Sequence, residues 1–259
     1  MNNMTDNNKG AKITLYWLNK SRSHRILWLL EELGLSYELK IFQRDSEMMA
    51  PPELKKIHPL GKSPVVTIET ANSDKPLVLA ESGAITEYLC DHFGGDKLVP
   101  KRYVEGKEGH IGAESEAWVR YRYFMHYCEG SLMPFLVFQL VVDTVKKAPG
   151  VPFFIKPIPR LVASKIESVF VSRNLFANFD FLEGQLRTAP NGGSFLCGKE
   201  LTAADIMMSF PVIAASTRGP LNEKYPMLKA YADRLQQQEG YKRAVAKVEE
   251  VNGKFEASL

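Results

Sequence analysis

The segment Gly61-Lys62-Ser63-Pro64-Val65-Val66 limits the possible folds more than any other stretch of the chain. Pro64 stands at the start of a β-branched run, Val65 to Glu69, where a proline costs no hydrogen bond between strands. The bond before a proline is also the one common place for a cis peptide. A cis bond here would turn the Ser63 backbone outward, so that it could pair with an extended peptide as an added strand.

Glu81 and Ser82 form a second candidate binding element. They follow a short apolar run, Leu77 to Ala80, and precede a helical pattern, so Ser82 is expected to be the helix N-cap. A helix N-terminus attracts a carboxylate, and the Glu81 carboxylate attracts an ammonium group. Together with Ser63 these groups fit glutathione, whose γ-glutamyl end carries both charges. The alternative interpretation is that Pro64 only starts a strand and Ser82 only caps a helix.

Composition indicates a soluble globular protein and excludes several classes. The 259 residues suffice for one large or two ordinary domains, and 45% are hydrophobic and 24% charged. A net charge of +3 without a basic block argues against nucleic acid binding. The apolar run 132–142 is too short for a transmembrane helix, and the polar residues 1–10 predict a disordered tail, so we expect a cytoplasmic protein. Cys90, Cys128 and Cys197 have no spacing typical of disulfide or zinc sites, and no metal is expected.

The order of patterns predicts two domains. Residues 11–95 read as β-α-β-α-β-β-α, which is the order of an α/β thioredoxin-like domain. Residues 96–106 are expected to be a linker, and residues 107–259 an all-helical domain. The strands are expected at 13–18, 37–42, 65–69 and 77–80, and the helices at 25–33, 51–57, 82–93, 108–145, 161–186, from 202, 226–238 and 241–251.

Two further features stand out in the helical half. Residues 148–159 are proline-rich and apolar, and we interpret them as an insertion longer than the usual helix connection. Thr202 and Asp205 form a variant capping box at the start of a helix, for which we expect a structural role worth about 1 to 2 kcal/mol.

The Gly-Lys-x-Pro motif followed by Glu-Ser resembles the cytosolic glutathione transferase superfamily, as do the preceding helix with Arg25 and the Thr-x-x-Asp box. The run from Pro51 to Gly61 is most similar to the fungal branch. The resemblance covers about residues 12–253. It implies a homodimer that conjugates glutathione to small hydrophobic electrophiles, with possible glutathione peroxidase activity. It also implies peripheral association with the endoplasmic reticulum, for which the apolar segment 132–159 is the one supporting feature.

A glutathione transferase holds the thiol of its substrate as a thiolate, and several hydroxyl groups could do so here. Lowering a thiol pKa by two units requires about 2.7 kcal/mol. Ser21 has the position relative to Arg25 that theta-like members give their catalytic serine, and Tyr16 lies near the tyrosine of other classes. Ser23 and Asn19 remain alternatives. Because this turn contains no cysteine, reductase chemistry by a protein thiol is disfavoured.

The remaining groups of the two substrates also have candidates. The glycine carboxylate of glutathione would contact Lys62, with His58 as a possible second partner, although Met48 and Met49 replace a basic residue of theta-like members. The electrophile is expected between the first turn and the long helix, against Trp17, Leu18, Tyr121, Tyr123, Phe124 and Tyr127. The helical spacing of these aromatic residues is equally typical of a core.

Two other functions remain open at this stage. One is a non-catalytic binding or assembly module with the same fold, because fold does not fix function. The other is a reductase or lyase that acts through glutathione.

Overall fold

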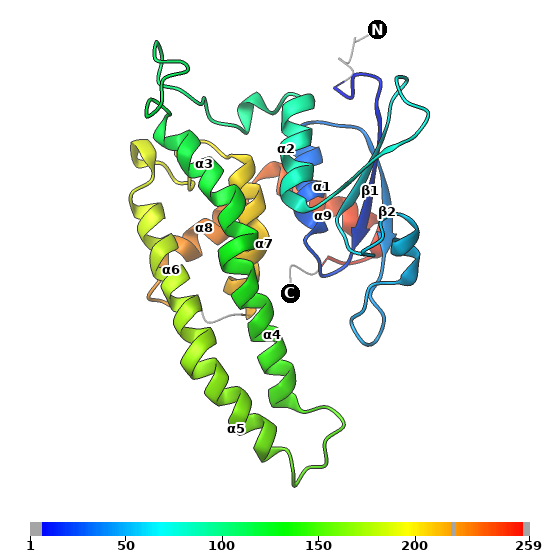
Figure 1. Ribbon diagram of the computed structural model, residues 1–259, viewed down its shortest axis with the longest axis vertical. Coiled ribbons are helices and arrows are strands. Elements are labelled where there is room, and N and C mark those ends of the chain that lie inside the picture. Colours follow the sequence, from blue (N-terminus) through cyan, green and yellow to red (C-terminus); the bar gives the residue numbers. More distant parts are fainter. Residues whose placement is uncertain (1–6, 219–220, 256–259) are drawn as a thin grey trace.

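A four-stranded sheet with two helices on one face forms the first domain of the computed structural model, which describes residues 7–218 and 221–255 (Figure 1). The strand order is β2-β1-β3-β4, with β1 parallel to β2 and the other pairs antiparallel. The predicted thioredoxin-like arrangement is therefore confirmed. The elements are β1 (Lys12–Leu18), α1 (Ser23–Glu32), β2 (Tyr37–Phe42), a 3₁₀ turn (Pro52–Lys56), β3 (Val65–Glu69), β4 (Leu77–Ala80) and α2 (Ser82–His92).

Helix α1 is buried nearly all round because it lies between the sheet and the second domain. Its residues Ile26 to Leu30 are fully buried. On β1, Ile13, Leu15 and Trp17 belong to the core on the α1 side of the sheet, whereas Tyr16 points to the other face.

Residues 7–10, which were predicted to belong to a disordered tail before the first domain, have a defined structure. Residues 1–6 of the predicted disordered tail lie outside the described residues. Asn7 and Asn8, however, donate side-chain hydrogen bonds to the carbonyls of Gly34 and Ser36 at 3.1 and 2.7 Å. This part of the tail is thereby held against the end of α1.

The second domain is helical, as predicted. The continuous helical stretch Glu116–Lys147 starts at Glu116 and not near residue 108, because Gly109 and Gly112 adopt φ values of 79° and 83°. Ser115 caps this helix by accepting a hydrogen bond from the Trp118 amide at 3.1 Å. The helices are α3 (Glu116–Tyr127), α4 (Met133–Lys147), α5 (Pro157–Ile166), α6 (Ser172–Arg187), α7 (Ala203–Arg218), α8 (Pro226–Gln236) and α9 (Glu239–Asn252), with π-helical turns at Cys128–Leu132 and Glu167–Val171 and 3₁₀ turns at Gly95–Lys97 and Pro190–Gly192.

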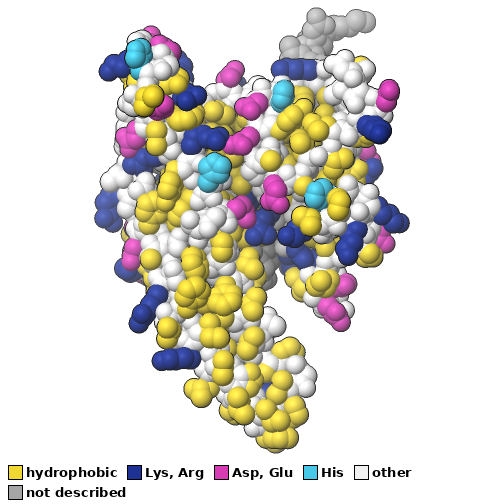
Figure 2. Space-filling model, in the orientation of Figure 1, with side chains coloured by type: hydrophobic (Ala, Val, Ile, Leu, Met, Phe, Trp, Pro, Cys, Tyr) yellow, Lys and Arg dark blue, Asp and Glu magenta, His cyan; other side chains and the backbone are white. Residues whose placement is uncertain are grey.

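Most of α4, all of α5 and the loop between them extend beyond the rest of the molecule as a long arm, which we define as residues 137–170 (Figure 1). Figure 2 shows hydrophobic side chains gathered over its lower end. The prolines of the predicted insertion contribute here, since α5 begins at Pro157, earlier than the predicted start at 161. By length and composition alone, helix 116–147 could cross a membrane, and 28% of its apolar window is buried.

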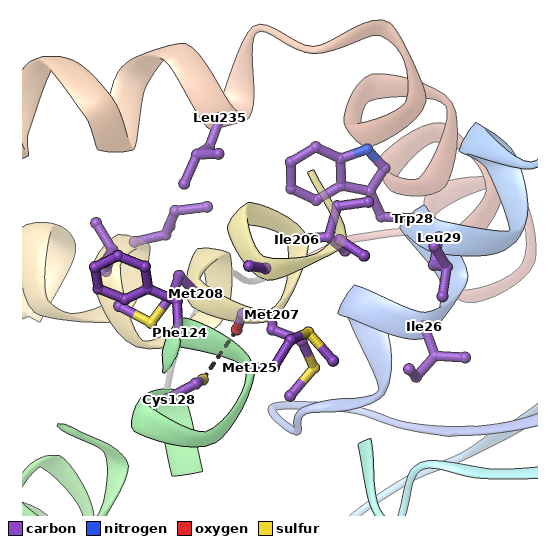
Figure 3. Packing of buried hydrophobic residues seen from close by; sticks show 14 of the residues in the cluster. Ile26, Trp28, Leu29, Phe124, Met125, Cys128, Ile206, Met207, Met208 and Leu235 are labelled. Atoms are coloured by element: carbon purple, nitrogen blue, oxygen red, sulfur yellow. Dashed lines mark hydrogen bonds between the residues drawn. The ribbon is translucent and has the colours of Figure 1, made fainter. Parts of the chain in front are cut away.

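One hydrophobic core crosses the domain boundary (Figure 3). Ile26, Trp28 and Leu29 from α1 lie near Phe124 and Met125 from α3, with residues of α7 between them. The two domains consequently form one packing unit, which fixes the first turn of α1 relative to the helical domain.

The Thr202–Asp205 box has the expected structural role. Besides capping α7, it forms hydrogen bonds to residues outside this helix. The buried Asp205 carboxylate accepts hydrogen bonds from the amide and hydroxyl of Thr202 at 2.9 and 2.6 Å. It also accepts from the Leu196 amide at 3.0 Å and the Tyr231 hydroxyl at 2.7 Å. The carboxylate thus joins α7, α8 and the preceding loop.

We predict that Asp205→Ala lowers the free energy of unfolding by about 3 to 5 kcal/mol, because it leaves four buried donors without an acceptor. Tyr231→Phe removes one of these donors and should cost about 1 kcal/mol. Urea denaturation of both variants measures the difference. Equal losses would contradict the central role of the carboxylate.

Candidate active site

The loop before β3 forms the first wall of the candidate site. The Ser63–Pro64 peptide bond is cis, the isomer considered from the sequence. The Ser63 hydroxyl donates to the Tyr16 carbonyl at 2.8 Å and so fixes the loop to β1. Within residues 7–218 and 221–255, the backbone amide and carbonyl of Ser63 have no hydrogen-bond partner. They are available to the backbone of a bound peptide.

The junction of β4 and α2 forms the opposite wall. Glu81, and not Ser82, occupies the N-cap position, and Ser82 is the first residue of α2. No side chain caps this helix end, so its first amide groups are available to an anion. Glu81 has φ 69° and ψ 121°, a backbone conformation that costs a residue other than glycine about 1 to 3 kcal/mol. This backbone conformation places the exposed Glu81 carboxylate beside these amide groups.

A polar cleft of about 190 Å³ lies between these walls. All six residues expected to bind glutathione contribute to it, which are His58, Lys62, Ser63, Pro64, Glu81 and Ser82. The cleft therefore combines a cation, a free backbone segment, a helix N-terminus and a carboxylate.

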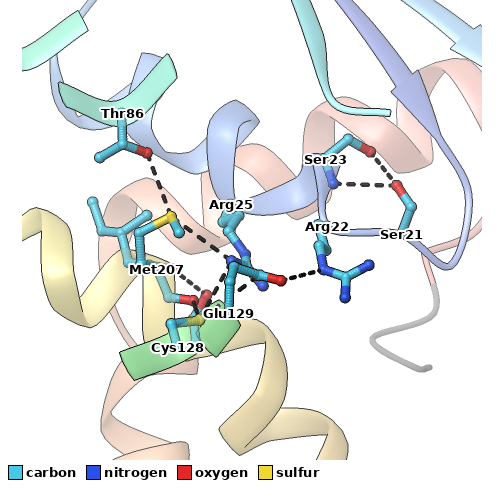
Figure 4. A network of polar contacts seen from close by, with 10 residues as sticks. Ser21, Arg22, Ser23, Arg25, Thr86, Cys128, Glu129 and Met207 are labelled. Carbon is cyan, nitrogen blue, oxygen red and sulfur yellow. Dashed lines mark hydrogen bonds and ion pairs between the residues drawn. The ribbon is translucent and has the colours of Figure 1, made fainter. Parts of the chain in front are cut away.

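Arg22 and Glu129 also line the polar cleft, and sequence reasoning missed both (Figure 4). Glu129 accepts from Arg22 Nε at 2.9 Å and from Arg25 Nη1 at 2.7 Å. The Arg25 side chain is fully buried, and a buried guanidinium requires a charged partner. The sequence does contain one indication of a buried ion pair, which is Arg25 on the apolar face of a predicted helix. It does not indicate which carboxylate pairs with this arginine.

Ser21 lies in the turn between β1 and α1, and its side chain is mostly buried. Its hydroxyl contacts the Leu18 carbonyl and the Ser23 hydroxyl, both at 2.7 Å, and accepts from the Ser23 amide at 3.2 Å. The Ser23 hydroxyl can itself donate to Leu18 O at 3.1 Å. The Ser21 hydrogen can therefore turn toward a ligand without leaving the Leu18 carbonyl unpaired.

The other hydroxyl candidates have different surroundings. The Tyr16 ring lies on the outer face of the sheet, against Phe42 and Lys40, whereas Ser21 adjoins Arg22, a residue of the polar cleft. Ser23 is fully buried and is the first residue of α1, not its N-cap. The Asn19 side chain accepts from the Arg44 amide. The geometry favours Ser21 over these alternatives.

The structure separates the residues expected to line the electrophile site. Trp17 lines an apolar hollow together with Ser21, His24, Arg25 and residues of α7 and α9. Tyr123 and Tyr127 instead stack on each other beside Phe181 and border a shallow depression on α3. The structure therefore does not bring these three aromatic residues together, because Trp17 lines the apolar hollow and the two tyrosines pack beside Phe181.

The cysteines are buried and free. Burial raises the pKa of Cys90 to about 12 and that of Cys128 to about 11, so neither thiol ionises near neutral pH. Among the described residues no group of three or more His, Cys, Asp or Glu side chains could hold a metal ion.

Comparison with known proteins gives consistent matches over most of the chain. Residues 11–91 match the family model for the glutathione S-transferase N-terminal domain, and residues 171–234 match that for the C-terminal domain. Glutathione S-transferase 1 of Saccharomyces cerevisiae is 35% identical over 94% of this chain and 98% of its own length. Glutathione S-transferase 3 of Schizosaccharomyces pombe is 34% identical, over 92% and 88%. A solved glutathione S-transferase from Actinobacillus pleuropneumoniae has 28% identity, 94% coverage of both chains and a TM-score of 0.66.

The strained backbone at Glu81 allows a test that separates binding from stability. Glu81→Gln removes the charge and keeps the strain, whereas Glu81→Gly removes both. We predict that each variant binds glutathione at least tenfold more weakly, because a charge-assisted hydrogen bond contributes about 1.5 to 3 kcal/mol. We also predict that Glu81→Gly is about 1 kcal/mol more stable than Glu81→Gln.

Isothermal titration with glutathione and urea denaturation give the two results. Wild-type affinity in Glu81→Gln would rule out the carboxylate as a partner of the ammonium group. A less stable glycine variant would show that the Glu81 backbone is not strained.

Proposed function

The chain belongs to the glutathione S-transferase family, and from this premise we propose that it conjugates glutathione to small hydrophobic electrophiles. The observation that carries the proposal is the polar cleft, which unites all six residues expected to bind glutathione. Glutathione peroxidase activity toward organic hydroperoxides belongs to the same proposal, since both reactions begin with the same thiolate.

The groups of the polar cleft match those of glutathione in kind and order. The free backbone of Ser63 suits the cysteinyl backbone of the tripeptide. The α2 N-terminus and Glu81 suit the carboxylate and ammonium of the γ-glutamyl end. Lys62 and His58 offer positive charge and a hydrogen-bond donor for the glycine carboxylate.

Ser21 is the proposed activating group. It lines the apolar hollow, and its neighbour Arg22 lines the polar cleft, so it lies close to both spaces. A hydroxyl that donates to sulfur stabilises the thiolate, and the N-terminus of α1 directly behind it adds a favourable dipole. The available hydroxyl of Ser21, together with Glu81 and Ser82, argues against a purely non-catalytic module with this fold. The buried cysteines with raised pKa values argue against reductase chemistry by a protein thiol.

A thiol titration tests this proposal. We predict that bound glutathione has a thiol pKa well below its solution value of about 8.5 and that Ser21→Ala raises it by at least one unit. Tyr16→Phe removes a hydroxyl on the outer face of the sheet and should leave the pKa unchanged. Ultraviolet difference absorbance of the thiolate gives the pKa for each protein.

Each other outcome of this titration has a definite meaning. A depression that Tyr16→Phe abolishes would transfer the role to Tyr16. Glutathione binding with no depression in wild type would favour the non-catalytic module.

We also propose that the chain forms a homodimer through the face of α3. Val119 and Tyr123 on this face are exposed by 51% and 49%, beside the open depression of about 480 Å³. The neighbouring Arg122 pairs with Glu87 of α2 at 2.6 Å. Apolar side chains beside a paired charge suit the self-complementary interface of a twofold dimer.

For localisation we propose that the arm, residues 137–170, contacts an anionic membrane surface. At its end the side chains of Phe153, Phe154 and Leu161 are 83%, 69% and 75% exposed. The arm contains five basic and two acidic residues, and one of the acids, Glu167, pairs with Lys146. Apolar side chains among basic residues suit the interface of a bilayer with anionic lipids.

Flotation with lipid vesicles tests this placement. We predict that the protein binds phosphatidylserine-containing vesicles, that salt weakens the binding, and that the pair Phe153→Ser and Phe154→Ser lowers it at least fivefold. Ile111→Ser is the matched control, since Ile111 is fully exposed outside the arm. Absence of vesicle binding would refute the proposal, and a fall in mass by light scattering in the arm variant would assign the arm to the dimer instead.

A further inference from the structure

Two arginines share one carboxylate at the boundary between the two domains (Figure 4). Arg22 Nε donates to one oxygen of Glu129 at 2.9 Å, and Arg25 Nη1 donates to the other oxygen at 2.7 Å. Within residues 7–218 and 221–255, neither guanidinium pairs with a second carboxylate. These three side chains, which we call the Arg–Glu–Arg triad, therefore carry one positive charge in excess.

The excess charge of the triad is weakly screened by water. The Arg25 side chain is fully buried, and the side chains of Arg22 and Glu129 are only 37% and 33% exposed. Arg25 Nε and Nη2 have no hydrogen-bond partner among the described residues. A charge in such surroundings acts on nearby groups more strongly than one at the surface does. Arg44 is one such group, because burial and the charge of Arg22 both lower its pKa.

The triad lies beside the place proposed for the glutathione thiol. Arg22 is the N-cap residue of α1 and directly follows Ser21, the proposed activating residue. Arg22 and Glu129 line the polar cleft, whereas Arg25 lines the apolar hollow together with Ser21. Glu129 holds Arg22 through Nε, and the Nη groups of Arg22 make no hydrogen bond within the part of the chain that the structure describes. They are available to a ligand in the polar cleft.

The charges of glutathione leave one partner for the triad. In the proposed binding mode, Glu81 pairs with the ammonium group, the α2 N-terminus with the γ-glutamyl carboxylate, and Lys62 with the glycine carboxylate. His58, also on the lining, adds a hydrogen-bond donor for the glycine carboxylate. Each permanent charge of the ligand is then matched. The triad keeps its excess positive charge, and bound glutathione can still acquire one negative charge, on its sulfur.

We propose that the excess positive charge of the Arg–Glu–Arg triad stabilises the glutathione thiolate, with Arg22 supplying the charge at the polar cleft and Glu129 fixing and moderating it. The proposal rests on the transferase function and adds two residues to Ser21 as determinants of the thiol pKa. The Ser21 hydroxyl supplies a directed hydrogen bond, whereas Arg22 acts through its charge. The thiol proton leaves to bulk water, and the triad then balances the charge that remains on sulfur.

The two members of the Arg22–Glu129 pair are therefore expected to act in opposite directions. Loss of the Arg22 charge leaves the triad neutral and should raise the thiol pKa of bound glutathione. Loss of the Glu129 charge leaves two positive charges and should lower that pKa further. A pair that only held the first turn in place would behave differently, because loss of either partner would disturb the same turn in the same way.

Two glutathione analogues measure this effect at the sulfur position. Glutathione sulfonate carries a fixed negative charge there, whereas S-methylglutathione is neutral. We define the preference for the sulfonate as the ratio of the two dissociation constants from isothermal titration, a ratio that does not depend on the fraction of folded protein. We predict that Arg22→Gln lowers this preference at least threefold and raises the thiol pKa of bound glutathione by at least about 0.5 unit. Glu129→Gln should raise the preference at least threefold, and Arg22→Lys, which keeps the charge, should retain most of the wild-type preference.

Arg243→Gln is the matched control. It removes another ion pair between the helical domain and α1, because Arg243 Nε contacts Glu31 at 3.1 Å near the other end of the helix, and it should leave the preference unchanged. Equal affinity of wild type for the two analogues, an unchanged preference in Arg22→Gln, or a fall in both pair variants would overturn the proposal. Arg22→Gln decides the question even if Glu129→Gln does not fold, because it keeps the Arg25–Glu129 pair. A wild type that binds neither analogue nor glutathione would instead refute the transferase function.

Discussion

The buried guanidinium of Arg25 is the constraint on which the two-domain structure depends. Its charge lies inside the core, and the carboxylate of Glu129, more than a hundred residues away along the chain, pairs with it at 2.7 Å. Removing Glu129 would leave the buried guanidinium without its counter-charge, which costs about 3 to 5 kcal/mol. Neither domain can satisfy this charge alone, so the pair fixes α1 against the helical domain.

This constraint also shapes the site. Glu129 belongs to the π-helical turn Cys128–Leu132, a feature that often marks functional positions. The same carboxylate pairs with Arg22 on the wall of the polar cleft. Ser21 consequently lies close to both a polar cleft suited to glutathione and an apolar hollow that holds unsatisfied donors. Strain at Glu81 and unpaired atoms at Trp17 both cost stability, as is common where function requires a preorganised group.

Local sequence signals predicted most of the fold correctly. The bounds of β2, β3 and β4 agree with the prediction because alternation and turn residues act within a few positions. The start of α3 was predicted too early, since glycines with positive φ ended the helical pattern that composition suggested. Within the candidate site, Ser63, Glu81 and their neighbours were found because each motif carries its own chemistry on a short stretch.

The sequence by itself therefore determined the two-domain class and the polar cleft, whose residues all lie within a short part of the chain, 58–82, apart from the wall that Arg22 and Glu129 add. Only the tertiary structure decided that Trp17 lines a hollow with Phe255 and His24, while Tyr123 and Tyr127 border a separate depression beside Phe181. Periodicity shows which face of a helix is apolar, but it does not show what that face contacts. Contacts between distant residues depend on how whole elements pack, and no local pattern records that packing.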